Sequence, residues 1–292
     1  MREGKRVTSI RGGVSLRWLG ASTFEIEHAG RVLLLDPFTS RPADARPIRS
    51  EAASDALRGD PILVTHGHWD HFADVPDLAA RLGATVYLPD PLRTLHALRL
   101  RALLRADEAV RWRSWSENRR IELAGLIVQA FPVHREECRG RWLRRAGRLA
   151  AAGHRDLRTF ANALRLSIWH PLSNAVAVHV THAATATSVF FFGSLTRQVY
   201  GLPDPPLRVD VLALPASQDS DWWIDDATGL ISLLKPRVVM VHHHDDWCPP
   251  HTRPADGEGF RRAIRDRCDV PVFVPPFATR FALADAIAVA LR

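Results

Sequence analysis

The chain has 292 residues, a mass of 32.6 kDa and a formal net charge of +7. Hydrophobic residues make up 46%, close to the globular average, which predicts a full hydrophobic core and excludes a disordered chain. No apolar run approaches the roughly 20 residues of a membrane helix, and the N-terminal segment lacks the apolar core of a secretory signal. The three cysteines are far apart in the sequence. We therefore expect a reduced, cytoplasmic protein with no membrane span and no disulfide scaffold.

The positive charge is concentrated in one segment. Residues 135–158 contain eight arginines and three acidic residues, a local net charge of +5. Trp142, Leu143, Ala146 and Leu149 recur within it at helical spacing. The pattern predicts a single basic helical patch rather than a uniformly basic surface for nucleic acid.

Short apolar and β-branched runs recur between turn signals in the first half of the chain, which predicts many short strands. We expect strands at Val14–Leu19, Thr23–His28, Arg31–Asp36, Pro61–Thr65, Thr85–Leu88, Ala109–Trp115 and Ile121–Val133. Helices are expected at Arg49–Leu57, Phe72–Leu82 and Pro91–Leu104. Ala29-Gly30 predicts a hairpin turn, and Gly83 predicts the end of a helix.

The second half of the chain continues this alternation. Strands are expected at Asn174–His182, Ser188–Phe192, Val209–Leu214, Arg237–Val241 and Val270–Val274. Helices are expected at Ala227–Leu234, Gly259–Arg267 and Leu283–Leu291. Alternating strands and helices favour an α/β protein with layered sheets, and no repeat or long linker divides the chain.

The strongest chemical signal is the heptapeptide THGHWDH at residues 65–71, which lies between a predicted strand and a predicted helix. It places His66, His68, Asp70 and His71 within six residues. Imidazole and carboxylate are ligands of zinc and similar metals, and this many in one turn is costly unless something binds them. Alternate residues of an extended turn point the same way, so His66 and His68 can share one ion. Asp70 and His71 would then face a second.

The motif HGHWDH resembles the HxHxDH signature of the metallo-β-lactamase superfamily, and the opening WLGASTFEIEHAGRVLLLDPF resembles the first strands of that family. The resemblance runs from about Leu16 to Val274. It implies a four-layer αβ/βα sandwich with the metals at the edge between two sheets. We expect a single domain of this fold over residues 1–292, with a basic helical insertion at about 135–158.

The resemblance also implies where the remaining ligands lie. The family places a third histidine for the first ion after a later strand, and His134 follows such a strand here. The last family ligand corresponds to His243, or to His242, because strand register decides which side chain faces the metals. At the place of the bridging aspartate of the family, this chain carries Ser194. A neutral serine predicts weaker binding of the second ion. Three outcomes stay open: one ion, two ions bridged by hydroxide alone, or an added carboxylate from Asp245 or Asp246.

Three residues are further candidates for substrate contact. Trp222 and Trp223 follow a predicted strand end, where loops of this fold line the active site. Core packing is the alternative interpretation of both rings. Asp246, beside the late histidines, is the third candidate.

These ligands predict metal-assisted hydrolysis, because a bound ion lowers the pKa of water towards about 7 and provides metal-bound hydroxide. Asp70 would hold the second ion or pass a proton to the leaving group. We expect one or two divalent ions, zinc first and iron or manganese as alternatives. The expected substrate is a small molecule, anionic or neutral, with an ester, lactone, amide or phosphodiester bond. Two alternatives stay open: a phosphodiesterase that holds nucleic acid or phospholipid through the basic patch, and a non-hydrolytic iron–oxygen enzyme or lyase.

Overall fold

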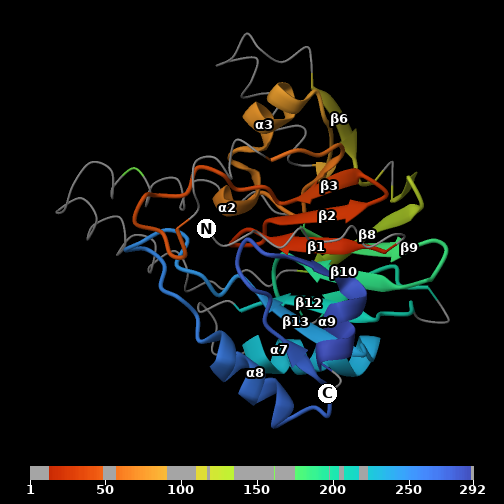
Figure 1. Cartoon of the computed structure of the whole chain (residues 1–292), viewed down its shortest axis with the longest axis vertical. Coiled ribbons are helices and arrows are strands. Elements are labelled where there is room, and N and C mark those ends of the chain that lie inside the picture. Colours follow the sequence, from red (N-terminus) through yellow and green to blue (C-terminus); the bar gives the residue numbers. More distant parts are fainter. Residues whose placement is uncertain are drawn as a thin grey trace, which may run out of the picture.

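The computed structural model describes residues 13–48, 57–90, 110–116, 119–134, 161, 175–196, 198–203, 207–216 and 223–290. Two mixed β-sheets lie face to face, and helices cover their outer faces (Figure 1). The strands are β1 (Ser15–Trp18), β2 (Phe24–His28), β3 (Arg31–Leu35), β4 (Ile62–Leu63), β5 (Thr85–Leu88), β6 (Arg111–Ser114), β7 (Arg120–Leu123), β8 (Leu126–His134), β9 (Ala175–His182), β10 (Ser188–Phe192), β11 (Gln198–Val199), β12 (Val211–Pro215), β13 (Val238–His242), β14 (Val272–Phe273) and β15 (Arg280–Ala282). The helices are α2 (Trp69–Phe72), α3 (Val75–Leu82), α7 (Trp223–Leu234), α8 (Gly257–Arg265) and α9 (Leu283–Ala290).

The first sheet has the strand order β15-β1-β2-β3-β4-β5-β6. The β2–β3 hairpin turns at Ala29 and Gly30, whose φ angles of 48° and 75° match the predicted turn. From β3 to β6 the strands are parallel. Their carboxyl ends therefore lie at one edge of the sheet, and the HGHWDH segment follows β4 at that edge.

The second sheet has the order β11-β8-β9-β10-β12-β13-β14, with β7 also paired to β8. Strands β10, β12, β13 and β14 are parallel. The stretch Ile121–Val133, predicted as continuous strand, is interrupted by a turn at Ala124 and Gly125, whose φ angles are 47° and 85°. Two strands therefore replace one, and the longer of them ends at His134.

Apolar side chains form three buried layers. The layer between the sheets includes Leu16, Phe24, Leu33, Val128, Val178 and Val189. Helices α7 and α8 pack on the second sheet through Leu230, Ile231, Phe260 and Ile264. Helix α3 covers the first sheet through Val75, Leu78 and Ala79. Figure 1 shows the resulting order of helix, sheet, sheet and helix, which confirms the expected α/β sandwich.

Some expected elements differ from the structure or fall outside it. The helix expected at Phe72–Leu82 begins later, as α3 at Val75, and a separate short helix, α2, ends at Phe72. Ala73 and Asp74 between them keep right-handed helical dihedral angles. The short strand β15 was not expected. The helices expected at 49–57 and 91–104 lie almost wholly outside the described residues, and the basic segment 135–158 lies entirely outside them. Among the helices described, none is both long and apolar enough to cross a membrane.

Candidate metal centre

The carboxyl edges of both sheets meet at the HGHWDH segment. The backbone carbonyl of Thr65, just after β4, accepts a hydrogen bond of 2.9 Å from the Val176 amide of β9. Crevices at the carboxyl ends of parallel strands are the usual binding sites of open α/β sheets. The candidate ligands therefore lie where two such edges converge.

The histidine-rich segment divides into an extended part and a helical part. His68 has an extended backbone with φ of −68° and ψ of 156°, and α2 begins at the next residue. His66 Nε2 and His68 Nδ1 lie 3.1 Å apart, as expected for alternate residues of an extended turn. We name these two rings, together with His134, the first-ion site.

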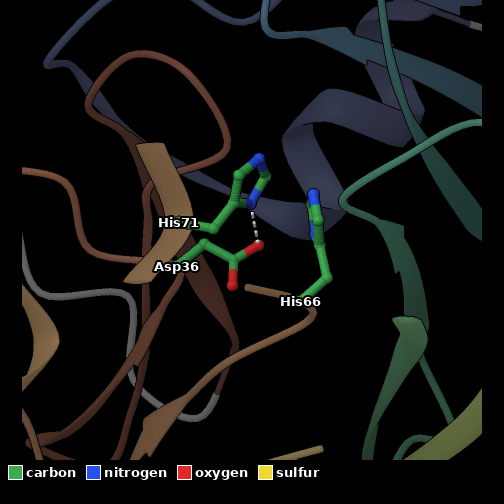
Figure 2. Close-up of side chains that lie close together, drawn as sticks. All are labelled: Asp36, His66 and His71. Atoms are coloured by element: carbon green, nitrogen blue, oxygen red, sulfur yellow. Dashed lines mark hydrogen bonds and ion pairs between the residues drawn. The ribbon is translucent and has the colours of Figure 1, made fainter. Parts of the chain in front are cut away.

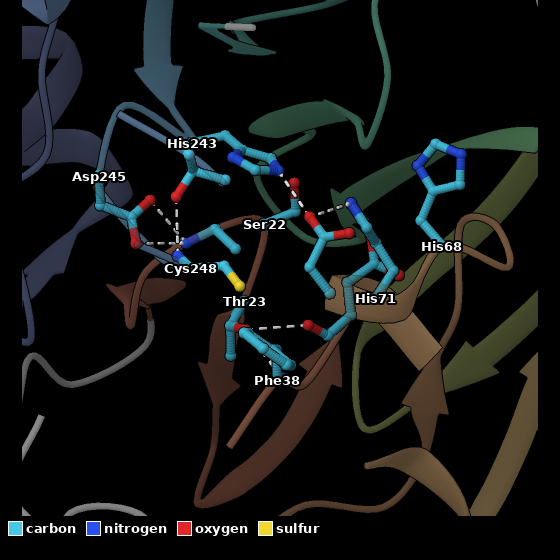
Figure 3. Close-up of polar contacts among 12 residues, drawn as sticks. Ser22, Thr23, Phe38, His68, His71, His243, Asp245 and Cys248 are labelled. Carbon is cyan, nitrogen blue, oxygen red and sulfur yellow. Dashed lines mark hydrogen bonds and ion pairs between the residues drawn. The ribbon is translucent and has the colours of Figure 1, made fainter. Parts of the chain in front are cut away.

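Asp70 and His71 lie in α2 and face the late histidines. Asp70 Oδ2 lies 3.3 Å from His71 Nε2 and 2.9 Å from His243 Nε2. These three ligand atoms lie within 4.8 Å of one another. We name them the second-ion site, and Figure 3 shows the His71 and His243 rings of this site directed toward each other.

The three consecutive histidines point in different directions. His243 reaches Asp70, whereas the His242 ring packs edge-on against Phe24 and the His244 ring lies against Trp18. Burial, with a smaller contribution from the charge of His243, holds the pKa of His242 well below its usual range, so this ring is neutral. The structure thus brings His243, and not His242, to the second-ion site.

Asp36 belongs to the site although the sequence marked it only as the end of a strand. Its Oδ2 accepts a hydrogen bond of 2.7 Å from His71 Nδ1, as Figure 2 shows beside His66. The same carboxylate accepts bonds of 2.7 Å and 2.5 Å from the amide and hydroxyl of Thr65. A carboxylate on one nitrogen of a ligating histidine is the usual support of a metal site. The bond leaves His71 Nε2 facing Asp70 Oδ2, 3.3 Å away.

The electrostatics of the second-ion site favour a cation. Burial opposes protonation of His71, but Asp70 and Asp36 outweigh it and raise the pKa of His71 to about 10. Burial would also raise the pKa of Asp70, yet the charge of His71 and hydrogen bonds from His71 and His243 hold it well below its usual range. Two buried carboxylates converge on one imidazole, and a divalent ion satisfies the same negative charge. The nitrogen and oxygen donors fit zinc or a similar ion.

His134 and Ser194 follow strands at the same edge. His134 ends β8, next to the β9 segment that bonds Thr65, while its side chain lies outside the described part. Gly193 lies against the ligand loop, because a Cβ there would overlap the Thr65 hydroxyl. Ser194 follows directly and is half-buried. That Ser194 occupies the bridging position stays a prediction.

Known proteins share both the sequence and the fold. Residues 31–155 match the family model described as a beta-lactamase superfamily domain. A protein of Thermococcus onnurineus named a metal-dependent hydrolase is 26% identical over 263 residues, which cover 90% of this chain and 97% of the relative. Both similarities point to the metallo-β-lactamase superfamily. A second relative, from Pyrococcus horikoshii, is 27% identical over 267 residues and is also named a metal-dependent hydrolase.

Solved structures of metallo-β-lactamase-fold proteins support the same fold. Igni18, a metallo hydrolase from Ignicoccus hospitalis, has a TM-score of 0.60 at 16% identity, covering 92% of this chain and 98% of that one. YhfI from Bacillus subtilis, a metallo-beta-lactamase fold protein, has a TM-score of 0.60 at 11% identity, covering 93% and 100%. The predicted resemblance to this superfamily and the fold that it implies are therefore confirmed.

The residues predicted to contact substrate, or to add a carboxylate to this metallo-β-lactamase-fold site, lie away from the metal ligands or are hydrogen-bonded to other groups. Trp223 stacks on Phe260 at 4.0 Å, between the outer helices α7 and α8, which is the packing interpretation of this ring. Trp222 lies outside the described residues. Asp246 accepts a hydrogen bond of 2.7 Å from the Thr252 hydroxyl. Asp245 is bound to a backbone amide and an arginine, so neither aspartate is directed to the second-ion site.

Proposed function

We propose that the chain hydrolyses an ester, lactone, amide or phosphodiester bond in a small molecule, with one or two divalent ions, zinc first, held by its histidine cluster. The observation that carries this proposal is the convergence of Asp70, His71 and His243 beside the His66–His68 pair. A bound divalent ion supplies hydroxide at neutral pH by lowering the pKa of its water. The sequence contains no motif for a different activated nucleophile, so metal-activated water is the proposed nucleophile.

The protein residues have separate roles in this proposal. His66, His68 and His134 would hold the first ion, and Asp70, His71 and His243 the second. Asp36 holds the proton on His71 Nδ1, so that Nε2 faces the ion. If only the first ion is bound, Asp70 Oδ2, which lies within hydrogen-bond distance of His243, would instead accept the proton of the attacking water and pass it to the leaving group.

The shape of the cluster supports access from one side. His66, Asp70 and His71 are buried, whereas His68 and His243 are half-buried. A substrate would therefore approach past the His68 and His243 rings. Trp69 and Trp247 are buried, with ring centroids 6.2 Å apart, and Trp247 packs 5.8 Å from the His243 ring on the inner side of the site.

The test is a hydrolysis screen of the purified, metal-loaded chain with esters, lactones, amides and phosphodiesters. We expect turnover of at least one class, its loss in His243→Ala, and little dependence on salt. Turnover that falls steeply with salt and is inhibited by polyanions would instead support the phosphodiesterase alternative. Bound iron without hydrolysis of any class would contradict the proposal and support oxygen chemistry.

A further inference from the structure

His243 has a backbone conformation that needs support. Its φ of 59° lies in the left-handed region, which is costly for a residue other than glycine. From this conformation its Nε2 reaches to 2.9 Å from Asp70 Oδ2. A residue with a strained backbone keeps that conformation only where neighbouring contacts stabilise it.

Asp245, two residues further on, provides such a contact. Both of its carboxylate oxygens accept hydrogen bonds from the Ala21 amide, at 2.9 Å and 3.0 Å. Arg41 Nη2 forms an ion pair with Asp245 Oδ2 at 2.9 Å. The two side chains are 4% and 0% exposed, so the pair is shielded from water and from substrate.

The loop that carries Arg41 is fastened on both sides of it. The amides of Thr39 and Ser40 donate to Asp74 Oδ2, at the start of α3. Further along, Arg46 and Asp246 exchange two backbone hydrogen bonds of 2.8 Å and 2.9 Å. The Arg41 guanidinium also lies 5.5 Å from the centre of the Phe277 ring. Contacts with Asp74, with the Asp246 backbone and with the Phe277 ring therefore fix the position of Arg41 independently of Asp245.

Glycine is required where the two loops approach. Gly20 has a φ of 96°, and a Cβ there would overlap Arg41 Nη1 and lie 2.8 Å from Asp245 Oδ2. The next residue, Ala21, also has a positive φ, of 44°. The β1–β2 turn is thus shaped to fit the ion pair and to direct one amide at Asp245.

We propose that the buried Arg41–Asp245 pair is a positioning device that holds the His243 segment in its left-handed conformation and thereby sets the affinity of the second-ion site. This inference rests on the proposed metal-dependent function. Neither residue is a ligand or touches substrate: the pair acts through His243. Because removal of partners that orient metal ligands typically lowers affinity by about 10- to 100-fold, we expect a loss of that size at the second-ion site alone.

The experiment titrates metal-free protein with Zn²⁺ by calorimetry, in the wild type and in Asp245→Asn, Arg41→Met and Arg41→Lys. We expect Zn²⁺ to bind the second-ion site about 10- to 100-fold more weakly in the first two variants, with partial recovery in Arg41→Lys. The affinity of the first-ion site should change less than about twofold. Glu25→Gln is the matched control, because Glu25 is 3% exposed and pairs with Arg17 and Arg280 on β1 and β15. It should lower the melting temperature without changing either affinity.

A double variant separates positioning from stability. Replacing a buried ion pair by apolar side chains often restores stability. Arg41→Met/Asp245→Leu should therefore melt closer to the wild type than Arg41→Met does, yet keep the weak second-ion site. If affinity recovers together with the melting temperature, or if the single variants bind Zn²⁺ as the wild type does, the inference is overturned.

Failure of the proposed function would look different. In that case the wild type and His243→Ala would bind Zn²⁺ equally or not at all. A crystal structure of metal-free Asp245→Asn then tests the pair on its own. We expect His243 to leave the left-handed region and its contact with Asp70 to open, whereas an unchanged His243 would refute the positioning role.

Discussion

The contact between Gly193 and the ligand loop predicts that Gly193→Ala disrupts the site. The φ of Gly193 is not positive, so alanine is not excluded by the backbone, and the conflict is steric. The added Cβ would overlap the Thr65 hydroxyl and lie 3.1 Å from Asp36 Oδ2. Thr65 must therefore move, and its 2.5 Å hydrogen bond to Asp36 is lost or distorted.

The expected magnitude follows from two contributions. Overpacking of a buried contact costs about 1–3 kcal/mol, and loss of a hydrogen bond to a charged group costs about 1.5–3 kcal/mol. We expect the free energy of unfolding to fall by about 2.5–6 kcal/mol. Since Thr65 Oγ1 also lies 2.9 Å from His66 Nδ1, Zn²⁺ affinity at the first-ion site should fall with it.

Urea unfolding of the metal-free protein checks this prediction with a double-mutant cycle. Thr65→Ala removes the hydroxyl that the new methyl group would meet, so adding Gly193→Ala to it should cost less than about 1 kcal/mol. Gly229→Ala in α7 is the control, because nothing lies within 4 Å of its added Cβ. Alanine should stabilise that helix by up to about 1 kcal/mol. Equal costs of Gly193→Ala in both backgrounds would refute the steric reasoning.

Four further predictions concern single residues. Asp36→Asn should weaken Zn²⁺ binding by about 10- to 100-fold in calorimetry, because His71 loses its carboxylate partner; unchanged affinity would contradict that role. Ser194→Asp should tighten the second ion by about tenfold, and unaltered stoichiometry and affinity would show that Ser194 is not at the bridging position. Burial lowers the pKa of His179 to about 4. The free energy of unfolding should therefore fall by up to about 3 kcal/mol as pH drops from about 6.5 to 4. Thermal melts at several pH values should show a smaller dependence on pH in His179→Gln. Trp223→Ala should destabilise the fold by about 1–3 kcal/mol and leave kcat/KM of the best screened ester unchanged, whereas a lower kcat/KM would place the ring in the substrate site.

Local signals were sufficient for most of the fold. Strands with apolar periodicity between turns, such as β2 and β3 around Ala29-Gly30, follow from the sequence because both strands and the turn are encoded within a dozen residues. The apolar run around residues 124–125 predicted one strand, but the structure has a hairpin between β7 and β8 there. The Ala-Gly pair at its turn is the same local signal as in the β2–β3 hairpin. Short β15 pairs with β1 across almost the whole chain, and no local pattern reveals such a partner.

The candidate site, like the fold, has a part that the local sequence predicts and a part that depends on distant residues. His66, His68, Asp70 and His71 are adjacent in sequence, so their spacing alone indicates a metal. The role of Asp36 depends on a partner 35 residues away, and that of Asp245 on an amide 224 residues away. Only the folded sheets bring these groups together. The choice of His243 over His242 likewise depends on a left-handed backbone at the strand end, which strand periodicity does not predict.

Metal content per chain, measured by elemental analysis on protein purified without an affinity tag, tests the central claim most directly. We predict one or two bound divalent ions per chain, fewer in His243→Ala, and an unchanged number in Trp223→Ala. A chain that carries no metal after gentle purification, or that carries the same number in wild type and His243→Ala, would contradict a metal centre built on Asp70, His71 and His243.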